Sequence, residues 1–312
     1  MSKQASQATI QQLFDSALVG FMAETKPAQA KKICHIKTQT GGEKATFYLI
    51  EKSTAQKAEN GVIPSMYKGE GKTNAGSTRK VEVPIGKIYY QDTVEDDEIK
   101  KTNIDLKSAF VVSMGNGLLR KEDMQVIEAI KDAIANFQET SGDSSTQKPK
   151  VLDLTTAGSI AVEANMKKFF ARIRKATALA SMTTSPERYK GVVVFMNSNN
   201  WAEMSTSEFL LNSDYNNAIK DGDKEKPTTI MGAELIIMDD LEDGEIYVVP
   251  SGTACWFEWE NSMVAHAEFK PFAGMTWFLQ AVKSVGCKVS DGARITQIKV
   301  APPTMLEDAA SL

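Results

Sequence analysis

The sequence feature that most constrains the fold is a long polar segment between two β-type segments. From Ser53 to Arg79 the chain carries four glycines and only four large apolar residues, which are Val62, Ile63, Met66 and Tyr67. Loops longer than about 12–15 residues without structure of their own are uncommon in compact domains. Strand patterns precede this segment at 45–52 and follow it at 80–91. The sequence therefore predicts a long two-stranded arm with a polar tip. Because an isolated two-stranded ribbon is marginal in water, the arm needs something outside its own domain to lie on.

Helices are predicted on both sides of this arm. In 8–25 apolar residues recur at spacings of three and four, and Pro27 ends that amphipathic helix. A strand is predicted at 32–38, and an acidic, charged connector occupies 92–101. A long helix is predicted from about 104 to 137. Two of its residues, Gly115 and Gly117, each cost about 1 kcal/mol of helix stability relative to alanine, which favours a kink or a close helix–sheet contact there.

The second half of the chain alternates between helices and strands. A linker is predicted at 140–150, and helices at 159–180 and 200–211. The strand patterns lie at 191–196, 229–238, 246–250, 254–259, 263–269, 275–285 and 295–300. In the strand that begins at Met263, small and apolar side chains alternate with polar ones, which is typical of a half-buried antiparallel strand.

Composition lowers the odds of several functional classes. Lys and Arg total 36 and Asp and Glu total 40, so the net charge is -4 and the chain is not a generally basic nucleic-acid binder. Only two histidines are present, and most metal sites and catalytic triads draw on histidine. The three cysteines, Cys34, Cys255 and Cys287, lie in apolar strand patterns and are interpreted as small buried hydrophobes in a reducing compartment. We find neither a membrane-spanning run nor a signal-peptide pattern.

Four sequence motifs partly match known ligand sites. Gly69 to Thr73 lacks the first glycine of a phosphate-binding loop, since Met66 occupies that position. Asp221 to Asp223 begins like a calcium loop, but position twelve is Gly232 rather than an acid. The carboxylates at 239–243 are interpreted as a turn before the next strand. The basic helix face of Lys168, Arg172 and Lys175 could touch phosphate, but it is interpreted as a solvated face.

The two histidines are His35 and His266. His266 and Glu268 share one face of a predicted strand, so an acid–base pair is conceivable, but no nucleophile lies nearby in the sequence. His35 and Cys34 are adjacent on a strand and point to opposite faces, so they do not form a dyad. The sequence therefore predicts no catalytic, cofactor-binding or metal residues, and the chain is not expected to be an enzyme.

The order of elements resembles the major capsid proteins of tailed double-stranded DNA phages, with the Hong Kong 97 phage fold. Gln11 to Asp15 looks like the family's N-terminal arm, Lys37 to Gln91 like its extended E-loop, and Ile104 to Phe137 like its spine helix. Within that helix, the run from Leu118 to Asp123 is similar to a segment that many members carry. Thr229 to Gly232 and Ile246 to Pro250 look like late strands of the peripheral and axial domains.

The resemblance implies an α+β Hong Kong 97-like capsid fold. It divides the chain into an N-terminal arm (1–36), an extended E-loop (37–92), a peripheral domain with the spine helix (93–150), a mainly axial domain (151–275), and return strands of the peripheral domain with a C-terminal tail (276–312). Because the arm starts almost at Met1, a separate scaffolding protein is expected. Cross-linking through loop lysines such as Lys68 or Lys72 is known in the family's namesake, but nothing in the sequence indicates it.

The expected function is a self-assembling shell protein. Copies would form hexamers and pentamers of an icosahedral virion capsid, assembled in the bacterial cytoplasm. The shell would enclose DNA without sequence-specific binding, with scaffolding, portal and decoration proteins as further partners, and with no membrane and no cofactor. Two alternatives stay open: an encapsulin-like compartment shell of the same fold, and an uncharacterised α/β enzyme in which His266 and Glu268 would be the first residues to mutate.

Overall fold

The computed structural model describes residues 18, 28–50, 78–95, 109–136, 149–183, 191–207, 210, 219–220, 228–260, 263–270 and 276–303. These residues form a mixed α+β structure with two large sheets and one small sheet. The predicted helix at 8–25 lies outside them except for Leu18, which is helical and fully buried in the largest core cluster.

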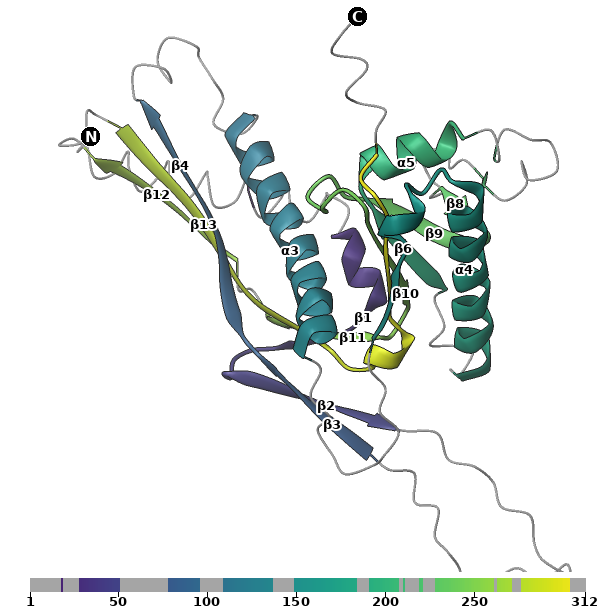
Figure 1. The fold of residues 1–312 in the computed structure, drawn as a ribbon. Coiled ribbons are helices and arrows are strands. Elements are labelled where there is room, and N and C mark those ends of the chain that lie inside the picture. Colours follow the sequence, from purple (N-terminus) through teal and green to yellow (C-terminus); the bar gives the residue numbers. More distant parts are fainter. Residues whose placement is uncertain are drawn as a thin grey trace, which may run out of the picture.

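The first large sheet has five strands and is organised around one long strand, β13 (Thr276–Val289). β4 (Gly86–Glu95) pairs antiparallel with one edge of β13. On the other edge, β12 (Val264–Lys270) pairs with its first half and β11 (Ala254–Trp259) with its second half. β1 (Cys34–Gln39) completes the sheet by pairing parallel with β11. Figure 1 shows β4, β13 and β12 running side by side away from the rest of the molecule.

The second large sheet has seven strands in the order β5-β14-β10-β6-β9-β8-β7. Their bounds are β5 Lys150–Asp153, β6 Val192–Met196, β7 Ile219–Lys220, β8 Thr229–Ile230, β9 Ala233–Ile237, β10 Glu245–Pro250 and β14 Thr296–Lys299. The β5–β14 and β6–β9 pairs are parallel, and the other pairs are antiparallel.

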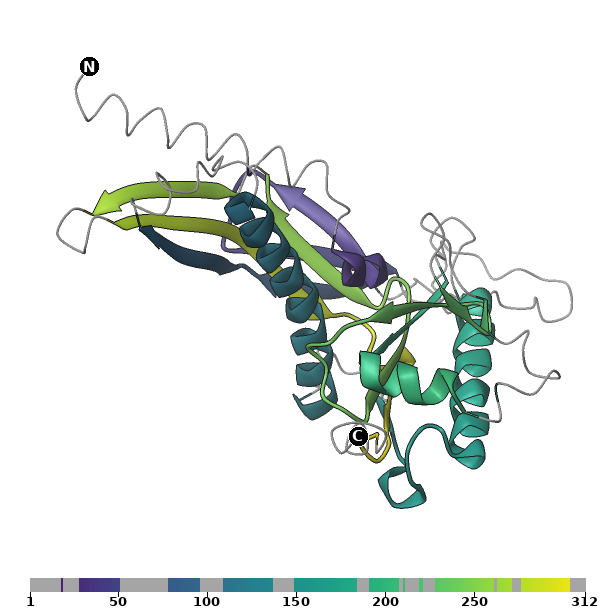
Figure 2. The ribbon, with the colours of Figure 1, turned by 90° about the horizontal axis from the view of Figure 1, so that it is seen from above.

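The long helix α3 (Ala109–Asn136) lies between the two large sheets, beside the short 3-10 helix η1 (Gln29–Ile33) (Figure 1). Helices α4 (Glu163–Thr183) and α5 (Ser198–Ser205) lie on the other side of the seven-stranded sheet, as Figure 2 shows from above. Two further 3-10 helices are η3 (Thr155–Ala157) and η5 (Gly292–Arg294). None of the described helices is long and apolar enough to span a bilayer.

The central strands of the seven-stranded sheet are buried on both faces. Their side chains pack alternately into two separate core clusters, one on each face. In β6, Val193 and Phe195 join the cluster that contains α3 and η1, whereas Val194 joins the cluster that contains α4. Tyr247 and Val248 of β10 divide in the same way. Strands covered on both faces have continuous apolar runs rather than alternation, which explains the sequence Val-Val-Val-Phe-Met of β6.

A third, two-stranded sheet pairs β2 (Lys44–Ile50) with β3 (Thr78–Pro84) in antiparallel register from Lys44↔Pro84 to Ile50↔Thr78. Figure 1 shows it crossing the lower end of the five-stranded sheet and pointing away from the core. The predicted two-stranded arm is therefore confirmed for these strands, while residues 51–77 lie outside the described part of the chain. The neighbouring strands β1 and β4, which overlap the two ends of 37–92, pair with β11 and β13 instead.

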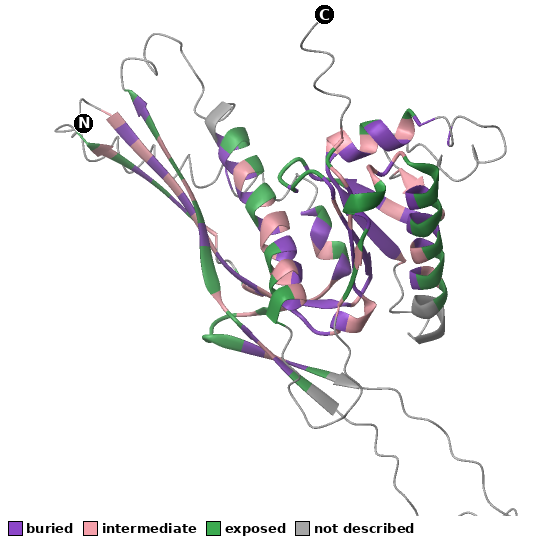
Figure 3. Cartoon of the chain, in the orientation of Figure 1, coloured by how far each residue is buried: buried purple, intermediate pink, exposed green. Residues whose placement is uncertain are grey.

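Most of the predicted elements are present. The long helix, the helix at 159–180 and the strands at 246–250, 254–259, 263–269, 275–285 and 295–300 are confirmed within a few residues at each end, apart from ends outside the described part. The close helix–sheet contact at the glycines is confirmed as well, because a Cβ on Gly117 would lie 2.6 Å from Cδ2 of Tyr90 on β4. Figure 3 shows that buried residues recur along α3.

Two predictions about the second half were wrong or incomplete. A single strand at 229–238 is instead two strands, β8 and β9, joined by Met231 and Gly232 with φ of 50° and 81°. Positive φ at both central residues is typical of a tight two-residue hairpin turn. Gly232 is the sequence signal for this turn, because glycine adopts positive φ readily. Strand β5 was also missed, because it has four residues and directly follows the polar linker.

Two strands pair across the boundaries of the predicted domain ranges. β12 lies in the range 151–275 but pairs with β13 of the five-stranded sheet. β14 lies in the range 276–312 but forms part of the seven-stranded sheet between β5 and β10.

Candidate functional site

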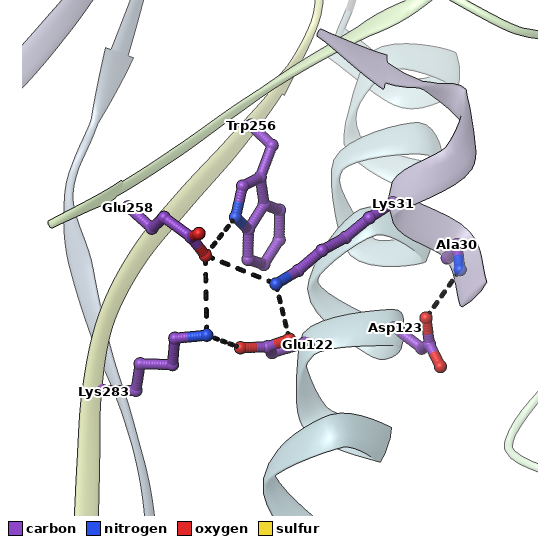
Figure 4. A network of polar contacts seen from close by, with 7 residues as sticks. All are labelled: Ala30, Lys31, Glu122, Asp123, Trp256, Glu258 and Lys283. Atoms are coloured by element: carbon purple, nitrogen blue, oxygen red, sulfur yellow. Dashed lines mark hydrogen bonds and ion pairs between the residues drawn. The ribbon is translucent and has the colours of Figure 1, made fainter. Parts of the chain in front are cut away.

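A cluster of four charged residues, one buried and three partly buried, joins elements of the N-terminal segment, the long helix and the five-stranded sheet. We call Lys31, Glu122, Glu258 and Lys283 the ionic cluster (Figure 4). Nζ of Lys31 lies 2.7 Å from Oε2 of Glu122 and 3.3 Å from Oε2 of Glu258. Nζ of Lys283 lies 2.5 Å from Oε1 of Glu122 and 3.5 Å from Oε2 of Glu258. The four charges sum to zero and come from η1, α3, β11 and β13, so the cluster links four separate elements.

The surroundings of the ionic cluster fix its geometry. Trp256 donates its indole N–H to Oε2 of Glu258 at 3.0 Å, and Nζ of Lys31 lies 4.5 Å from the centre of a Trp256 ring. Glu122 is the most buried member, with a side chain only 1% exposed. Its Oε2 accepts no hydrogen bond from the described residues, so the close approach of Lys31 is an ion pair without hydrogen-bond geometry.

Burial and charge oppose each other in the pKa values of this cluster. Burial alone would raise the pKa of Glu258, but Lys31, the indole of Trp256 and Lys283 outweigh it and hold that pKa below its ordinary value. Burial alone would lower the pKa of Lys283, but Glu122 and Glu258 outweigh it and raise that pKa. Both residues are therefore charged over the neutral pH range. This favours a structural role, in which the ion pairs link neighbouring elements, over a role in proton transfer.

Asp123, the residue after Glu122, anchors η1 by a different contact. Its Oδ1 accepts a hydrogen bond from the backbone N–H of Ala30 at 2.7 Å. Burial raises the pKa of Asp123 above its ordinary value, although the backbone N–H groups of Ala30 and Gln29 oppose this shift. Two neighbouring carboxylates on α3 thus hold η1. Glu122 forms an ion pair with Lys31, and Asp123 accepts a hydrogen bond from the backbone of Ala30.

The β2–β3 sheet is attached to the core through one small apolar cluster. Phe47 of β2 and Val81 and Val83 of β3 pack with Cys255 and Phe257 of β11. The end of β3 crosses directly over β13 at a glycine, because a Cβ on Gly286 would lie 2.1 Å from the carbonyl oxygen of Pro84. Only glycine allows this approach, so Gly286 sets how closely the projecting sheet lies on the core.

The exposed side of the β2–β3 sheet carries charge. Glu82 lies 2.7 Å from Nζ of Lys44 and 2.6 Å from Nζ of Lys80. Hydrogen bonds from these two lysines lower the pKa of Glu82 to about 2. Beside them, Tyr48 exposes 69% of its surface. The sheet therefore presents a charged and aromatic outer surface.

One face of the five-stranded sheet packs on α3, and the opposite face is open among the described residues. We call the side chains of β4, β13 and β12 on that side the open face. In the sheet register Tyr89 and Val264 flank Val282, and both are more than half exposed. Further along, Nζ of Lys270 lies 4.5 Å from the ring centre of Phe278. The open face thus has an apolar patch beside charged residues, which is typical of a surface that another protein covers.

The pair proposed for acid–base chemistry lies on this open face. His266 and Glu268 are both exposed on β12, as the strand alternation predicted. Glu268 lies 3.8 Å from Nζ of Lys270. Neither residue lines the recess at the end of the seven-stranded sheet that is formed by residues such as Lys150 and Arg172. Among the described residues, no group of three or more His, Cys, Asp or Glu side chains could hold a metal ion.

The other candidates fall into structural positions. The acidic run at 239–243 forms turns, as predicted, and ties them to neighbouring elements: Asp240 lies 3.7 Å from Arg120, Glu242 lies 2.9 Å from Lys131, and Asp243 accepts a hydrogen bond from Asn199. Residues 68–73, including Lys68 and Lys72, and residues 221–223 lie outside the described part of the chain.

The cysteines are free thiols at packing positions. Cys255 is buried, and Cys34 and Cys287 are partly buried against the main core. A hydrogen bond with Cys287 and burial raise the pKa of the Cys34 thiol well above its ordinary value, so Cys34 is a poor nucleophile at neutral pH. His35 packs against Gly252, where a Cβ would lie 3.1 Å from its Nε2.

Sequence reasoning missed the ionic cluster. Glu122 follows Leu118 by four residues and precedes Val126 by four, so it occupies the buried stripe of the helix. An acid at that position is a signal of a buried partner, because an unpaired buried charge is costly. The identity of the partners could not be read from the sequence, since Lys31, Glu258 and Lys283 come from three distant segments.

Several solved structures resemble this chain over most of its length. The capsid of the cyanophage P-SCSP1u matches with a TM-score of 0.59 and 14% identity, covering 89% of this chain and 89% of that chain. Mycobacterium phage Che8 matches with a TM-score of 0.58 and 13% identity, covering 88% of this chain and 92% of that chain. The virus-like particle from Pyrococcus furiosus matches with a TM-score of 0.54 and 13% identity, covering 93% of this chain and 99% of that chain.

No protein-family model matches the chain, and neither does any curated protein. At these low identities the structural likeness establishes the fold. The chain has the Hong Kong 97 fold of tailed-phage capsid proteins, as the resemblance implied.

Proposed function

We propose that this chain is a major capsid protein, whose copies form hexamers and pentamers of an icosahedral shell around a phage double-stranded DNA genome. The single observation that carries the proposal is the likeness to phage capsids over about nine-tenths of the chain, at a TM-score of 0.59 for the cyanophage P-SCSP1u. Such a shell protein is found in the virion and is assembled in the cytoplasm of the bacterial host.

Two surfaces support assembly. The β2–β3 sheet projects from the core, and a two-stranded sheet gains stability when it lies on a neighbour. The open face of β4, β13 and β12 offers Tyr89 and Val264 as exposed contacts for another copy. Each contact can be modest, because a closed shell repeats it many times and assembly stabilises the bound form.

The proposal includes further partners and a division of the chain. Scaffolding, portal and decoration proteins are expected partners, and DNA is enclosed without sequence-specific recognition. We assign 1–36 to an N-terminal arm, 37–92 to the E-loop, 93–150 and 276–312 to the peripheral domain with the tail, and 151–275 mainly to the axial domain. The pairing of β13 with β4 supports joining the last range to the peripheral domain.

A compartment shell of the same fold is the second candidate. The virus-like particle from Pyrococcus furiosus favours it, because the match covers 99% of that chain. Particle contents separate the two candidates. Nuclease-protected duplex DNA in purified particles, with genes for scaffold, portal and terminase nearby, supports a phage head, whereas a protein cargo supports a compartment.

The experiment that tests shell formation replaces 51–77 with Asn-Gly. Ile50 and Thr78 are cross-strand partners, so a two-residue turn can close the hairpin without changing its register. We expect shell-sized particles from the full chain, with or without scaffold, in electron microscopy. The shortened chain should fold with an unchanged unfolding midpoint but should form no shells. Monomers alone from the full chain under all conditions would contradict the proposal.

A further inference from the structure

A recess opens at the end of the seven-stranded sheet where five elements meet. These are the start of β5, the middle of α4, the end of β10, η5 and the start of β14. Its lining includes Lys150, Arg172, Lys175, Arg294, Thr296 and Pro250. The recess is open to solvent, and its empty volume, including solvent at the mouth, is about 380 Å³.

The charge of this recess is one-sided. Four of its lining residues are cationic and none is acidic, although the whole chain carries a net charge of -4. Arg294 has one counter-ion, since its Nε lies 2.7 Å from Oδ2 of Asp291, which does not line the recess. Within the part of the chain that the structure describes, Lys150, Arg172 and Lys175 have no ion-pair partner.

Concentrating like charges around a recess is unfavourable unless something compensates them. Lys150 of β5 and Arg172 and Lys175 of α4, which have no ion-pair partner among the described residues, line one space and repel one another. A doubly charged tetrahedral anion would accept hydrogen bonds from several of them at once, and such charge-assisted bonds are the stronger kind. Thr296, a neutral polar residue, belongs to the same lining.

We propose that this recess is a phosphate-binding site formed by Lys150, Arg172, Lys175 and Arg294. The basic stripe on α4 extends it, because Lys168 precedes Arg172 by four residues and lies exposed on the same helix face. A ligand with successive phosphates can therefore leave the recess along the helix. This geometry favours a nucleic-acid backbone as the source of the phosphate, with a free phosphate ion as the other source.

The inference goes beyond the proposed function and does not depend on it. A phosphate site on the folded subunit can be measured whether or not shells form. Conversely, a shell can assemble around DNA with no defined contact at this recess. The failure of either proposal is thus distinguishable from the failure of the other.

The test compares two double variants of the full chain with matched charge changes on one helix. Arg172→Gln with Lys175→Gln removes two lining cations. Lys167→Gln with Arg174→Gln removes two cations of α4 that do not line the recess. Thermal unfolding of both variants establishes that each is folded. Binding of inorganic phosphate is measured by calorimetry, and binding of a short mixed-sequence duplex DNA by fluorescence anisotropy between low and physiological salt.

We expect the recess variant to lower phosphate affinity by roughly tenfold or more, while the control variant changes it little. For duplex DNA, each neutralised phosphate contributes about −0.9 to the slope of log affinity against log salt, so the recess variant should have a less steep slope than the control variant. Competition between phosphate and DNA indicates the backbone as the source, and phosphate binding without DNA binding indicates the free ion. Equal losses in both variants, or absence of both kinds of binding, would overturn the site. An acidic peptide that binds there without competition from phosphate would also overturn it, in favour of a protein carboxylate.

Discussion

The ammonium group of Lys31 lies 2.7 Å from the carboxylate of Glu122, at the point where the N-terminal segment meets the long helix. Because Lys283 contacts the same carboxylate from β13, Glu122 is shared between the N-terminal segment and the five-stranded sheet. The helix α3 thus holds both by one buried side chain. Loss of that side chain would leave two lysines facing a single carboxylate, Glu258.

Neutralising the central acid should be strongly destabilising. Removing one partner of a buried ion pair typically costs about 3–5 kcal/mol, so we expect Glu122→Gln to lower the free energy of unfolding by about 3 kcal/mol. Urea unfolding of the unassembled subunit measures it. The control is Glu128→Gln on the same helix, whose exposed pair with Lys121 should contribute less than about 1 kcal/mol. Equal losses in both variants would show that the ionic cluster has no special role.

The ionic cluster should also give the subunit a bounded pH range of stability. The pKa of Glu258 is lower in the folded protein, so its contribution is present above the ordinary glutamate pKa and is lost as pH falls through the lowered value. The pKa of Lys283 is raised, so its contribution is present below about 10.5 and is lost as pH rises through the raised value. Glu258→Gln should reduce the loss of stability on the acid side, measured as the urea midpoint between pH 6 and pH 3. An unchanged acid limb in that variant would contradict this assignment.

Asp123 should respond in the opposite way, because burial raises its pKa. An acid with a raised folded-state pKa loses stability as pH rises from the ordinary pKa through the raised one. Asp123→Asn keeps an oxygen that accepts from the N–H of Ala30 and removes the charge, so we expect a change of less than about 1 kcal/mol at pH 7. Asp123→Ala leaves that N–H without its partner and should cost about 1–3 kcal/mol. Equal losses in the two variants would show that the charge, which both remove, matters and that the acceptor oxygen does not.

Local sequence patterns predict much of the secondary structure and burial. The contacts between residues that are distant in the sequence could not be predicted in this way. The alternation along β12 predicted that Ala265 and Ala267 are buried while His266 and Glu268 are exposed. The glycine in the middle of α3 predicted a close approach to a sheet. By contrast, nothing near Glu122 in the sequence names Lys31 or Lys283, because these contacts depend on how distant elements pack. The same holds for the recess. The sequence shows the basic residues on α4, but only the folded structure places them beside Lys150 and Arg294.

Gly117 tests how tightly α3 lies on β4. An alanine in a helix interior is intrinsically favoured over glycine by about 1 kcal/mol. Here its Cβ would lie 2.6 and 2.7 Å from two ring carbons of Tyr90, so the ring must move. We expect Gly117→Ala to destabilise by about 1–2 kcal/mol in urea unfolding. Combining it with Tyr90→Ala should change the sign, so that alanine at position 117 becomes stabilising in that background. A stabilising effect in the wild-type background would show that the ring yields freely.

Gly286 offers the sharpest link between packing and assembly. A Cβ there would lie 2.1 Å from the carbonyl oxygen of Pro84, and a backbone atom cannot rotate away as the ring of Tyr90 can. We therefore expect Gly286→Ala to shift β3 away from β13, at a cost of about 2–3 kcal/mol. The shift should loosen Phe47 and Val81 from β11, which hydrogen exchange of β2 and β3 measures. The matched control is Gly86→Ala, where the nearest atom to the new Cβ is 3.6 Å away.

If shell closure needs the projecting sheet to be held in a fixed position on the core, Gly286→Ala should abolish shells in electron microscopy and Gly86→Ala should not. Normal shells together with faster exchange in β2 and β3 would show that assembly does not require that fixed position.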